Sequence, residues 1–163
     1  MTTSTKRAGP RKSLGQHFLA DSRIAGRILD AAELSEDDLV VEIGPGRGAL
    51  TKRLVERVKR VVAVELDPDL IAALPQRLEN PANLTCVEAD ARVVDLAGLI
   101  APDTKYKVVA NLPYYAANPI VRRLLESETK PDVLVVMVQQ EVAKNMVAKP
   151  GDMGILSVAT QFY

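Results

Sequence analysis

The chain has 163 residues and an apolar content of 47%, which suits one domain with a buried core and excludes a wholly disordered protein. Its 21 basic and 21 acidic residues cancel, so the net charge gives no sign of a nucleic-acid partner. No apolar run approaches the ~20 residues that cross a bilayer, and the single Cys86 cannot form an internal disulfide, so we expect a soluble, cytoplasmic protein.

The first part of the chain carries a local excess of positive charge. Four basic residues come before any acid: Lys6, Arg7, Arg11 and Lys12. We therefore interpret residues 1–20 as a basic arm and residues 21–163 as the folded domain. Taken alone, such an arm is typical of a solvated chain terminus.

Behind the arm, helical and strand patterns alternate. The spacing of apolar residues predicts helices over 22–32, 50–58, 68–78, 93–99, 119–128 and 155–162. Short apolar runs predict strands over 39–43, 60–65, 84–88, 107–110 and 133–138. This alternation predicts an α/β fold, a parallel sheet with helices on both faces. Ligands bind such sheets beyond the carboxyl ends of the strands, where the strand order reverses.

The first predicted strand runs into a glycine-rich turn over 44–48. Gly44, Gly46 and Gly48 alternate with other residues there, a spacing that differs from the dinucleotide-binding pattern. Glycines allow a tight turn and leave the backbone open to a ligand. A plain strand-to-helix turn explains the same run, so the glycines alone do not assign a site.

Acidic residues follow the second and third predicted strands. Glu65, 21 positions after Gly44, can accept hydrogen bonds from two ribose hydroxyls, and its charge argues against a phosphorylated ribose. Asp67 precedes Pro68, which is typical of a helix cap. Asp90 follows the third strand and fits two roles, an acceptor for an adenine amine or a cap for the next element.

The fourth predicted strand runs into the sequence Asn-Leu-Pro-Tyr-Tyr at 111–115. An aromatic amine is a weak nucleophile because its lone pair is delocalised. The Asn111 side-chain oxygen and nearby backbone carbonyls can accept hydrogen bonds from both N–H groups of such an amine. Pro113 has no N–H, and its fixed torsion can direct the preceding carbonyls inward. Tyr114 can stack on a flat base. The alternative is a proline turn with both tyrosines in the core.

Together these motifs resemble the rRNA adenine dimethyltransferase family, which methylates adenines near the end of small-subunit rRNA. Five stretches carry the resemblance, in order within 12–163: 13–19, 41–46, 65–67, 90–91 and 111–114. The resemblance implies a Rossmann-like enzyme that transfers two methyl groups from S-adenosylmethionine to one adenine amine, leaving S-adenosylhomocysteine and using no metal.

The resemblance also implies roles for single positions. The implied cofactor-binding residues are His17, Leu19, Gly44, Gly46, Glu65, Asp90 and Asn111. Among them, His17 and Leu19 belong to the leading segment that closes over the cofactor. The implied catalytic residues are Asn111, Leu112, Pro113 and Tyr114, of which Tyr114 stacks on the target base. Transfer from a sulfonium donor depends on positioning, so His17 needs no catalytic titration.

The resemblance further implies a partner and a missing part. The partner is small-subunit rRNA or the assembling small subunit, in ribosome biogenesis, with no membrane, and we expect a monomer. The basic arm residues Lys6, Arg7, Arg11 and Lys12 then become candidates for phosphate contacts. Relatives continue with two more strands and a small helical domain, so we expect a truncated catalytic domain that binds cofactor better than it methylates rRNA.

Other functions remain open. Within the fold, the alternative is a methyltransferase acting on large-subunit rRNA adenine. From another class, it is a nucleic-acid-binding protein that keeps the fold without turnover. A small-molecule methyltransferase fits less well, because the motif at 111–114 suits a planar amine.

Overall fold

The computed structural model describes residues 19, 21–100 and 104–163, in which strands and helices alternate as predicted. The strands are β1 (Leu39–Ile43), β2 (Arg60–Glu65), β3 (Leu84–Glu88), β4 (Lys107–Asn111) and β5 (Val133–Met137). The α-helices of these residues are α1 (Ser22–Ala31), α2 (Thr51–Val55), α3 (Pro68–Arg77), α4 (Tyr114–Glu126), α5 (Gln140–Met146) and α6 (Ile155–Phe162). Among the helices described here, none has both the length and the apolar character of a membrane span.

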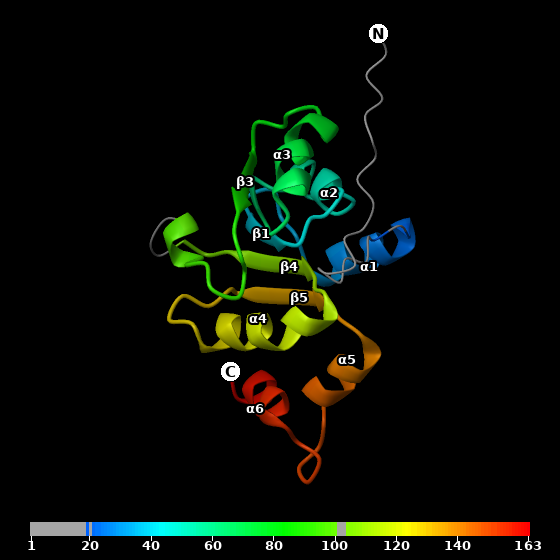
Figure 1. Ribbon diagram of the computed structural model, residues 1–163, viewed down its shortest axis with the longest axis vertical. Helices are drawn as coiled ribbons and strands as arrows, with labels where there is room; N and C mark the ends of the chain where they lie inside the picture. The colour runs from blue at the N-terminus through cyan, green and yellow to red at the C-terminus, as the bar shows by residue number, and fades with distance from the viewer. Residues whose placement is uncertain (1–18, 20, 101–103) are drawn as a thin grey trace.

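The described strands form one parallel five-stranded sheet in the order β3-β2-β1-β4-β5 (Figure 1). The chain moves outward from β1 through β2 to β3 and then returns to place β4 on the other side of β1. The strand order therefore reverses between β1 and β4, which is where doubly wound sheets bind ligands.

Alternating side chains of the strands are buried on the two opposite faces of the sheet. Val41 and Val108 belong to a cluster that includes the buried face of α4, while Val40 and Val109 pack with α1 and α2. Burial on both faces explains why these strands appear in the sequence as continuous apolar runs. The predicted α/β class with helices on both faces is confirmed.

Two helix starts follow from their capping residues. The Asp21 carboxylate accepts a hydrogen bond from the Arg23 N–H at 2.8 Å and begins α1. Asp67 accepts one from the Asp69 N–H at 3.0 Å and begins α3, with Pro68 at the first helical position. The capping role predicted for Asp67 is confirmed.

The predicted helix over 93–99 is wrong. One turn forms there, in which the Val94 N–H donates to the Asp90 carbonyl at 2.8 Å, and only the 3-10 helix η2 (Ala97–Leu99) follows. The apolar spacing reflects burial, because Val94 and Leu99 pack against the core without a regular helix.

Helix α4 begins at Tyr114, earlier than the predicted start at Pro119. The Pro113 carbonyl accepts hydrogen bonds from the N–H groups of Ala116 and Ala117, at 3.0 and 3.1 Å, and these open the helix. Pro119 removes one helical hydrogen bond, and burial of the alanines on the inner face offsets that cost. Helix α5 has no predicted counterpart, although Val142 and Met146, four residues apart, pack on the core.

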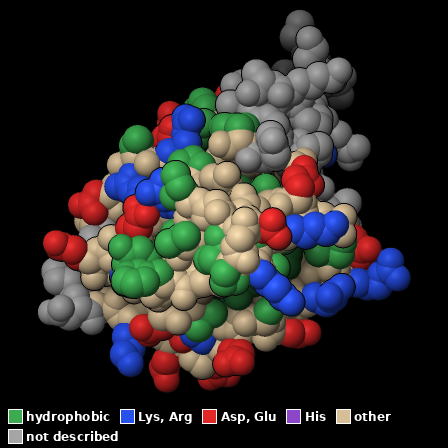
Figure 2. Space-filling view, turned by 90° about the horizontal axis from the view of Figure 1, so that it is seen from below, with side chains coloured by type: hydrophobic (Ala, Val, Ile, Leu, Met, Phe, Trp, Pro, Cys, Tyr) green, Lys and Arg blue, Asp and Glu red, His purple; other side chains and the backbone are tan. Residues whose placement is uncertain are grey.

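Exposed apolar side chains gather near α5 and α6. They are Val147, Ile155, Val158, Phe162 and Tyr163. Figure 2 looks at this end of the molecule and shows hydrophobic side chains among charged ones of both signs.

Candidate functional site

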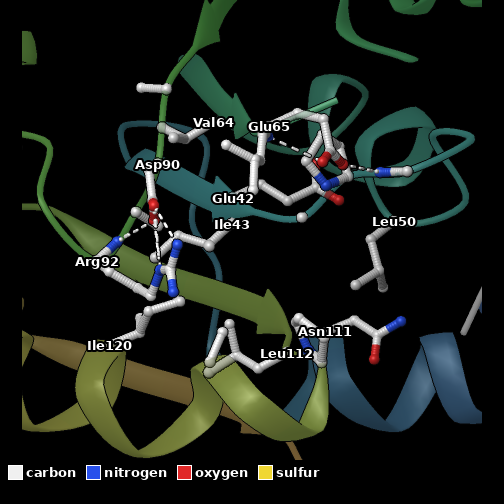
Figure 3. Close-up of a pocket in the computed structure, with 18 of the residues that line it drawn as sticks. Glu42, Ile43, Leu50, Val64, Glu65, Asp90, Arg92, Asn111, Leu112 and Ile120 are labelled. Carbon is white, nitrogen blue, oxygen red and sulfur yellow. Dashed lines mark hydrogen bonds and ion pairs between the residues drawn. The ribbon is translucent and has the colours of Figure 1, made fainter. Parts of the chain in front are cut away.

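A pocket opens at the carboxyl ends of β1, β2, β3 and β4. The space between its walls, counted together with the part that is open to solvent, is about 960 Å³. Of the predicted site residues it includes Leu19, Gly44, Gly46, Glu65, Asp90, Asn111, Leu112 and Pro113. Figure 3 shows Glu65, Asp90 and Asn111 on different sides of this opening. The four strand ends that the sequence singles out therefore meet at one place.

Gly44 allows the ends of β1 and β4 to approach each other. Its φ of +73° is rarely adopted by other residues, and an added Cβ would lie 3.2 Å from the backbone oxygen of Asn111. Its N–H donates to the Val64 carbonyl at 3.0 Å, which fixes the turn against β2. The glycine thus joins three strand ends without a side chain in the space between them.

Glu65 holds the glycine turn from the end of β2. Its Oε1 accepts hydrogen bonds from the N–H groups of Leu66 and Asp67 at 2.9 and 3.1 Å, and its Oε2 accepts one from Gly46 at 3.2 Å. These bonds aim the carboxylate at the turn and place it on the pocket wall.

Asp90 is engaged by Arg92. The Arg92 side chain donates to both carboxylate oxygens, with Nη2 2.6 Å from Oδ2, and its backbone N–H donates to Oδ1 at 2.9 Å. The Arg92 hydrogen bonds lower the pKa of Asp90 and outweigh the opposing effect of burial. The Arg92 guanidinium also lies 5.8 Å from the ring centre of Tyr115. Arg92 was not predicted as a site residue; its signal in the sequence is its position two residues after an acid at a strand end.

Glu42 lies in the wall of the same pocket and is 1% exposed. Burial raises its pKa to about 8; the polar groups of Thr51 act in the opposite direction, and the charge of Glu65 adds to the rise. Its Oε2 has no hydrogen-bond partner among the described residues. The motif at 41–46 includes Glu42, for which no role was predicted from the sequence. The available signal was an acid inside the apolar strand β1.

The segment after β4 forms the opposite wall. Leu112 is buried, and its N–H donates to the Met137 carbonyl at 3.1 Å, which ties the segment to β5. Pro113 caps α4 in an extended conformation, with φ −67° and ψ 149°. Tyr115 is 43% exposed, so placing both tyrosines in the core is wrong for this residue.

Several predicted residues lie outside the described part of the chain. They are His17, Lys6, Arg7, Arg11 and Lys12. The backbone of Tyr114 opens α4, and its side chain is likewise outside the description. The binding and catalytic roles of these residues, and of those that line the pocket, stay predictions. Within residues 19, 21–100 and 104–163, no group of three or more His, Cys, Asp or Glu side chains could hold a metal ion.

The family model for ribosomal RNA adenine dimethylase matches residues 8–163. This chain belongs to that family. The match covers the glycine turn, both acidic strand ends and the segment after β4, so all of the dimethylase-family pocket lies within it. The resemblance stated from the sequence motifs is confirmed.

Relatives of this dimethylase-family chain are similar over nearly all of it. The ribosomal RNA small subunit methyltransferase A of Dehalococcoides mccartyi is 46% identical over 153 residues, 94% of this chain and 53% of that protein. A dimethyladenosine transferase structure from Plasmodium falciparum is 28% identical with a TM-score of 0.78, covering 90% of this chain and 53% of that one. The 23S rRNA methyltransferase ErmE is 33% identical with a TM-score of 0.70, covering 88% and 55%. The chain spans about half the length of the curated relatives it matches.

Proposed function

We propose that this chain binds S-adenosylmethionine in the pocket at the strand ends and carries the catalytic centre of a small-subunit rRNA adenine dimethyltransferase. The observation that supports this most is the meeting of the Gly44 turn, two carboxylates and the Asn-Leu-Pro segment in one pocket. Family membership supports the same reaction. The product of the donor is S-adenosylhomocysteine, and no metal takes part in the proposal.

The groups in the pocket fit a donor made of a positively charged sulfur, a ribose and an adenine. A carboxylate offers about four acceptor sites, so Oε2 of Glu65, which accepts one N–H from Gly46, has room for a ribose hydroxyl. Ile43 and Ile120 line the pocket and offer apolar surface to a flat ring. The buried Oε2 of Glu42, without a partner in the described residues, suits a cationic ligand.

At Asp90 the proposal needs a rearrangement. Both oxygens of its carboxylate already accept hydrogen bonds from Arg92. An adenine amine reaching Asp90 therefore shares these oxygens with Arg92 or displaces its side chain. Arg92 is partly exposed, with 42% of its side chain accessible, which leaves it room to turn toward solvent.

The chain's own residues position the target amine. When bound, the cofactor supplies an activated methyl group on a charged sulfur. Asn111, at the end of β4, accepts a hydrogen bond from one N–H of the amine through its side-chain oxygen, and nearby backbone carbonyls accept a hydrogen bond from the other N–H. Pro113 fixes the backbone after them, and Tyr114 stacks on the base. Catalysis in this proposal is positioning and electrostatic stabilisation, without a general base.

The proposed partner is small-subunit rRNA or the assembling small subunit, in the cytoplasm, with the protein acting as a monomer. Residues 1–20 form a basic arm whose Lys6, Arg7, Arg11 and Lys12 contact phosphates, and 21–163 form the cofactor-binding domain. His17 and Leu19 close over the cofactor, and Leu19 lines the pocket. The 46% identity to a small-subunit methyltransferase supports the small-subunit substrate.

Calorimetric titration with S-adenosylmethionine tests the cofactor site. We expect Glu65→Ala and Asp90→Ala each to weaken binding about 10- to 100-fold, the value of a hydrogen bond to a charged group. Asp30→Ala, which removes an exposed acid of α1 outside the pocket, is the matched control and should bind like the unsubstituted protein. Unchanged affinity in both pocket variants would contradict the site.

Arg92→Ala tests whether Asp90 contacts the adenine amine directly or acts only by holding the turn together with Arg92. If Asp90 accepts the adenine amine, removing Arg92 frees its oxygens and binding should not weaken. Equal weakening in Asp90→Ala and Arg92→Ala would mean that the ion pair acts by holding the turn.

For catalysis, Asn111→Ala in the whole protein should abolish methyl transfer to small-subunit particles. Cofactor affinity is measured in parallel, and the assay is run at saturating cofactor, so that loss of turnover is separated from loss of binding. Full activity would exclude the role of Asn111.

A further inference from the structure

Glu42 is the one side chain of β1 that does not match its surroundings. The rest of the strand is apolar, yet Glu42 is 1% exposed, and its Oε2 has no hydrogen-bond partner among the described residues. Buried polar atoms without a partner are rare in folded proteins, and each one calls for a physical reason. Glu42 is one of the residues that line the pocket, so a charged ligand there lies close to an oxygen that the described residues leave without a hydrogen bond.

The titratable and polar groups around Glu42 do not neutralise it. They are Glu65 at the end of β2, Cys86 on β3 and Thr51 at the start of α2. From β4 the strand partner is the apolar Val109. The charged residues that share the pocket with it are Arg47, Glu65, Asp90 and Arg92. Of these, Arg92 is held by Asp90, and Glu65 adds a second negative charge near Glu42.

We propose that Glu42 is protonated in the free protein and releases its proton when the donor binds, so that its carboxylate faces a positive charge of the donor. This inference rests on the proposed function, since it takes S-adenosylmethionine as the ligand. The step breaks one O–H bond of the carboxyl and passes the proton to solvent. The charge that appears on Glu42 balances one positive charge entering the pocket, and nothing is oxidised or reduced.

The pKa of Glu42 supports this exchange. With a value of about 8, roughly nine-tenths of the carboxyl is protonated at pH 7. A positive charge at close range favours the ionised form and lowers that pKa. Donor binding is then coupled to the release of up to one proton, and the affinity for the donor rises with pH until about pH 8.

Calorimetric titration at pH 7 in two buffers of different ionisation enthalpy counts the protons released. We expect close to one proton per bound S-adenosylmethionine for the unsubstituted protein and about one fewer for Glu42→Gln, which keeps the shape and removes the titration. The difference between the two proteins excludes protons exchanged by the ligand's own amine. Between pH 6 and 8, the Kd of the unsubstituted protein should fall by up to about tenfold per pH unit relative to that of Glu42→Gln.

Two further variants test other sources of the proton. Cys86→Ser removes the neighbouring thiol, and His17→Gln removes the single histidine of the sequence. Protons are counted per molecule of donor bound, because His17 belongs to the proposed cofactor site. Proton release that persists in both variants supports Glu42, whereas release lost in either one while the donor still binds overturns the assignment. If Glu42→Gln does not fold, the number of protons released by the unsubstituted protein and by these two variants still tests the assignment to Glu42.

S-adenosylhomocysteine identifies the charge that Glu42 faces. It keeps the α-ammonium group and lacks the sulfonium, so release with both ligands assigns the ammonium, and release with the donor alone assigns the sulfonium. Donor binding with no proton released and a pH-independent Kd would overturn this inference and leave the proposed function standing. Absence of any donor binding would instead overturn the proposed function.

Discussion

At the scale of single residues, burial decides what Glu42 and Glu65 can do. Both are glutamates at neighbouring strand ends, and both line the pocket. Glu65 accepts three backbone N–H groups and is only half-buried, whereas Glu42 is enclosed and keeps an oxygen without a partner in the described structure. The same side chain thus serves as a fixed acceptor in one position and as a group of raised pKa in the other.

The raised pKa of Glu42 predicts a loss of stability with rising pH. The folded protein binds this proton more tightly than the unfolded chain, because the pKa of Glu42 is raised from its ordinary value of 4.5 to about 8. The free energy of unfolding should therefore fall as pH rises from about 4.5 to 8, by up to about 1.4 kcal/mol per pH unit from this group. Glu42→Gln should remove that slope and be the more stable protein at pH 8.

Urea unfolding at pH 5, 6.5 and 8 measures this difference. Glu56→Gln is the control, because it changes an exposed glutamate at the end of α2. We expect its free energy of unfolding to change with pH as that of the unsubstituted protein does. Identical slopes in Glu42→Gln and the unsubstituted protein would show that Glu42 titrates normally in the folded state.

At the scale of elements, the sequence predicts what depends on local pattern. The strands are recognisable because burial on both sheet faces leaves continuous apolar runs, and the carboxyl ends of parallel strands meet at one edge by topology. This is why Gly44, Glu65, Asp90 and Asn111 could be expected in one pocket before their positions were known.

Features that depend on contacts between distant or competing groups were not predictable in this way. The ion pair of Asp90 with Arg92 depends on side-chain geometry. From the sequence alone, Asp90 after the third strand fits both a helix cap and an acceptor for a ligand. Helix α4 starts before Pro119 because core packing outweighs a missing hydrogen bond. The pKa of Glu42 follows from enclosure by several elements, which strand periodicity does not report.

The amino-terminal ends of β1 and β4 are joined by an ion pair whose loss should destabilise the sheet. Lys107 Nζ lies 2.9 Å from Asp38 Oδ2, both side chains are less than one-fifth exposed, and Lys107 also donates to the Glu33 carbonyl. Burial raises the pKa of Asp38, but hydrogen bonds from Ser35 and Lys107 outweigh it, so the pKa lies below the usual value of 3.8. Asp38→Asn should cost about 1–3 kcal/mol at pH 7.

This contribution depends on the ionised carboxylate, so it is present above pH 3.8 and is lost as pH falls through the lowered pKa of Asp38. Unfolding curves of the two proteins should therefore converge in acid. The exposed pair Arg122–Glu126 on α4 is the matched comparison, and Glu126→Gln should change stability by less than about 0.5 kcal/mol. Equal losses of stability in Asp38→Asn and Glu126→Gln would mean that burial does not strengthen the stabilisation by the Asp38–Lys107 pair.

At the scale of the whole molecule, charge is balanced overall and uneven along the sequence. The 21 basic and 21 acidic residues give no general attraction to RNA, so binding of a polyanion has to come from local groups of positive charge. The sequence places four of them in the first 12 residues, next to the segment that leads to Leu19 in the pocket wall. In the proposed function, RNA contacts and cofactor binding therefore belong to adjacent parts of one chain.

The salt dependence of RNA binding tests whether the arm supplies this attraction. Each phosphate contact with single-stranded RNA adds about 0.7 to the slope of log affinity against log salt. Replacing Lys6, Arg7, Arg11 and Lys12 by alanine should therefore reduce the slope by up to about 3. The measurement is a titration of a small-subunit rRNA fragment at several salt concentrations, with the cofactor affinity followed in parallel.

A control with the same change in charge distinguishes local contacts from a general effect. Four exposed basic residues near the amino-terminal ends of β2 and β4 serve for this: Arg57, Lys59, Arg60 and Lys105. Arg60 begins β2, at the end of the strand opposite to the pocket, so these side chains should not reach phosphates of an RNA held at the pocket mouth. Their replacement should leave the slope unchanged. Equal losses in both quadruple variants would mean that net charge, rather than the arm, attracts the RNA.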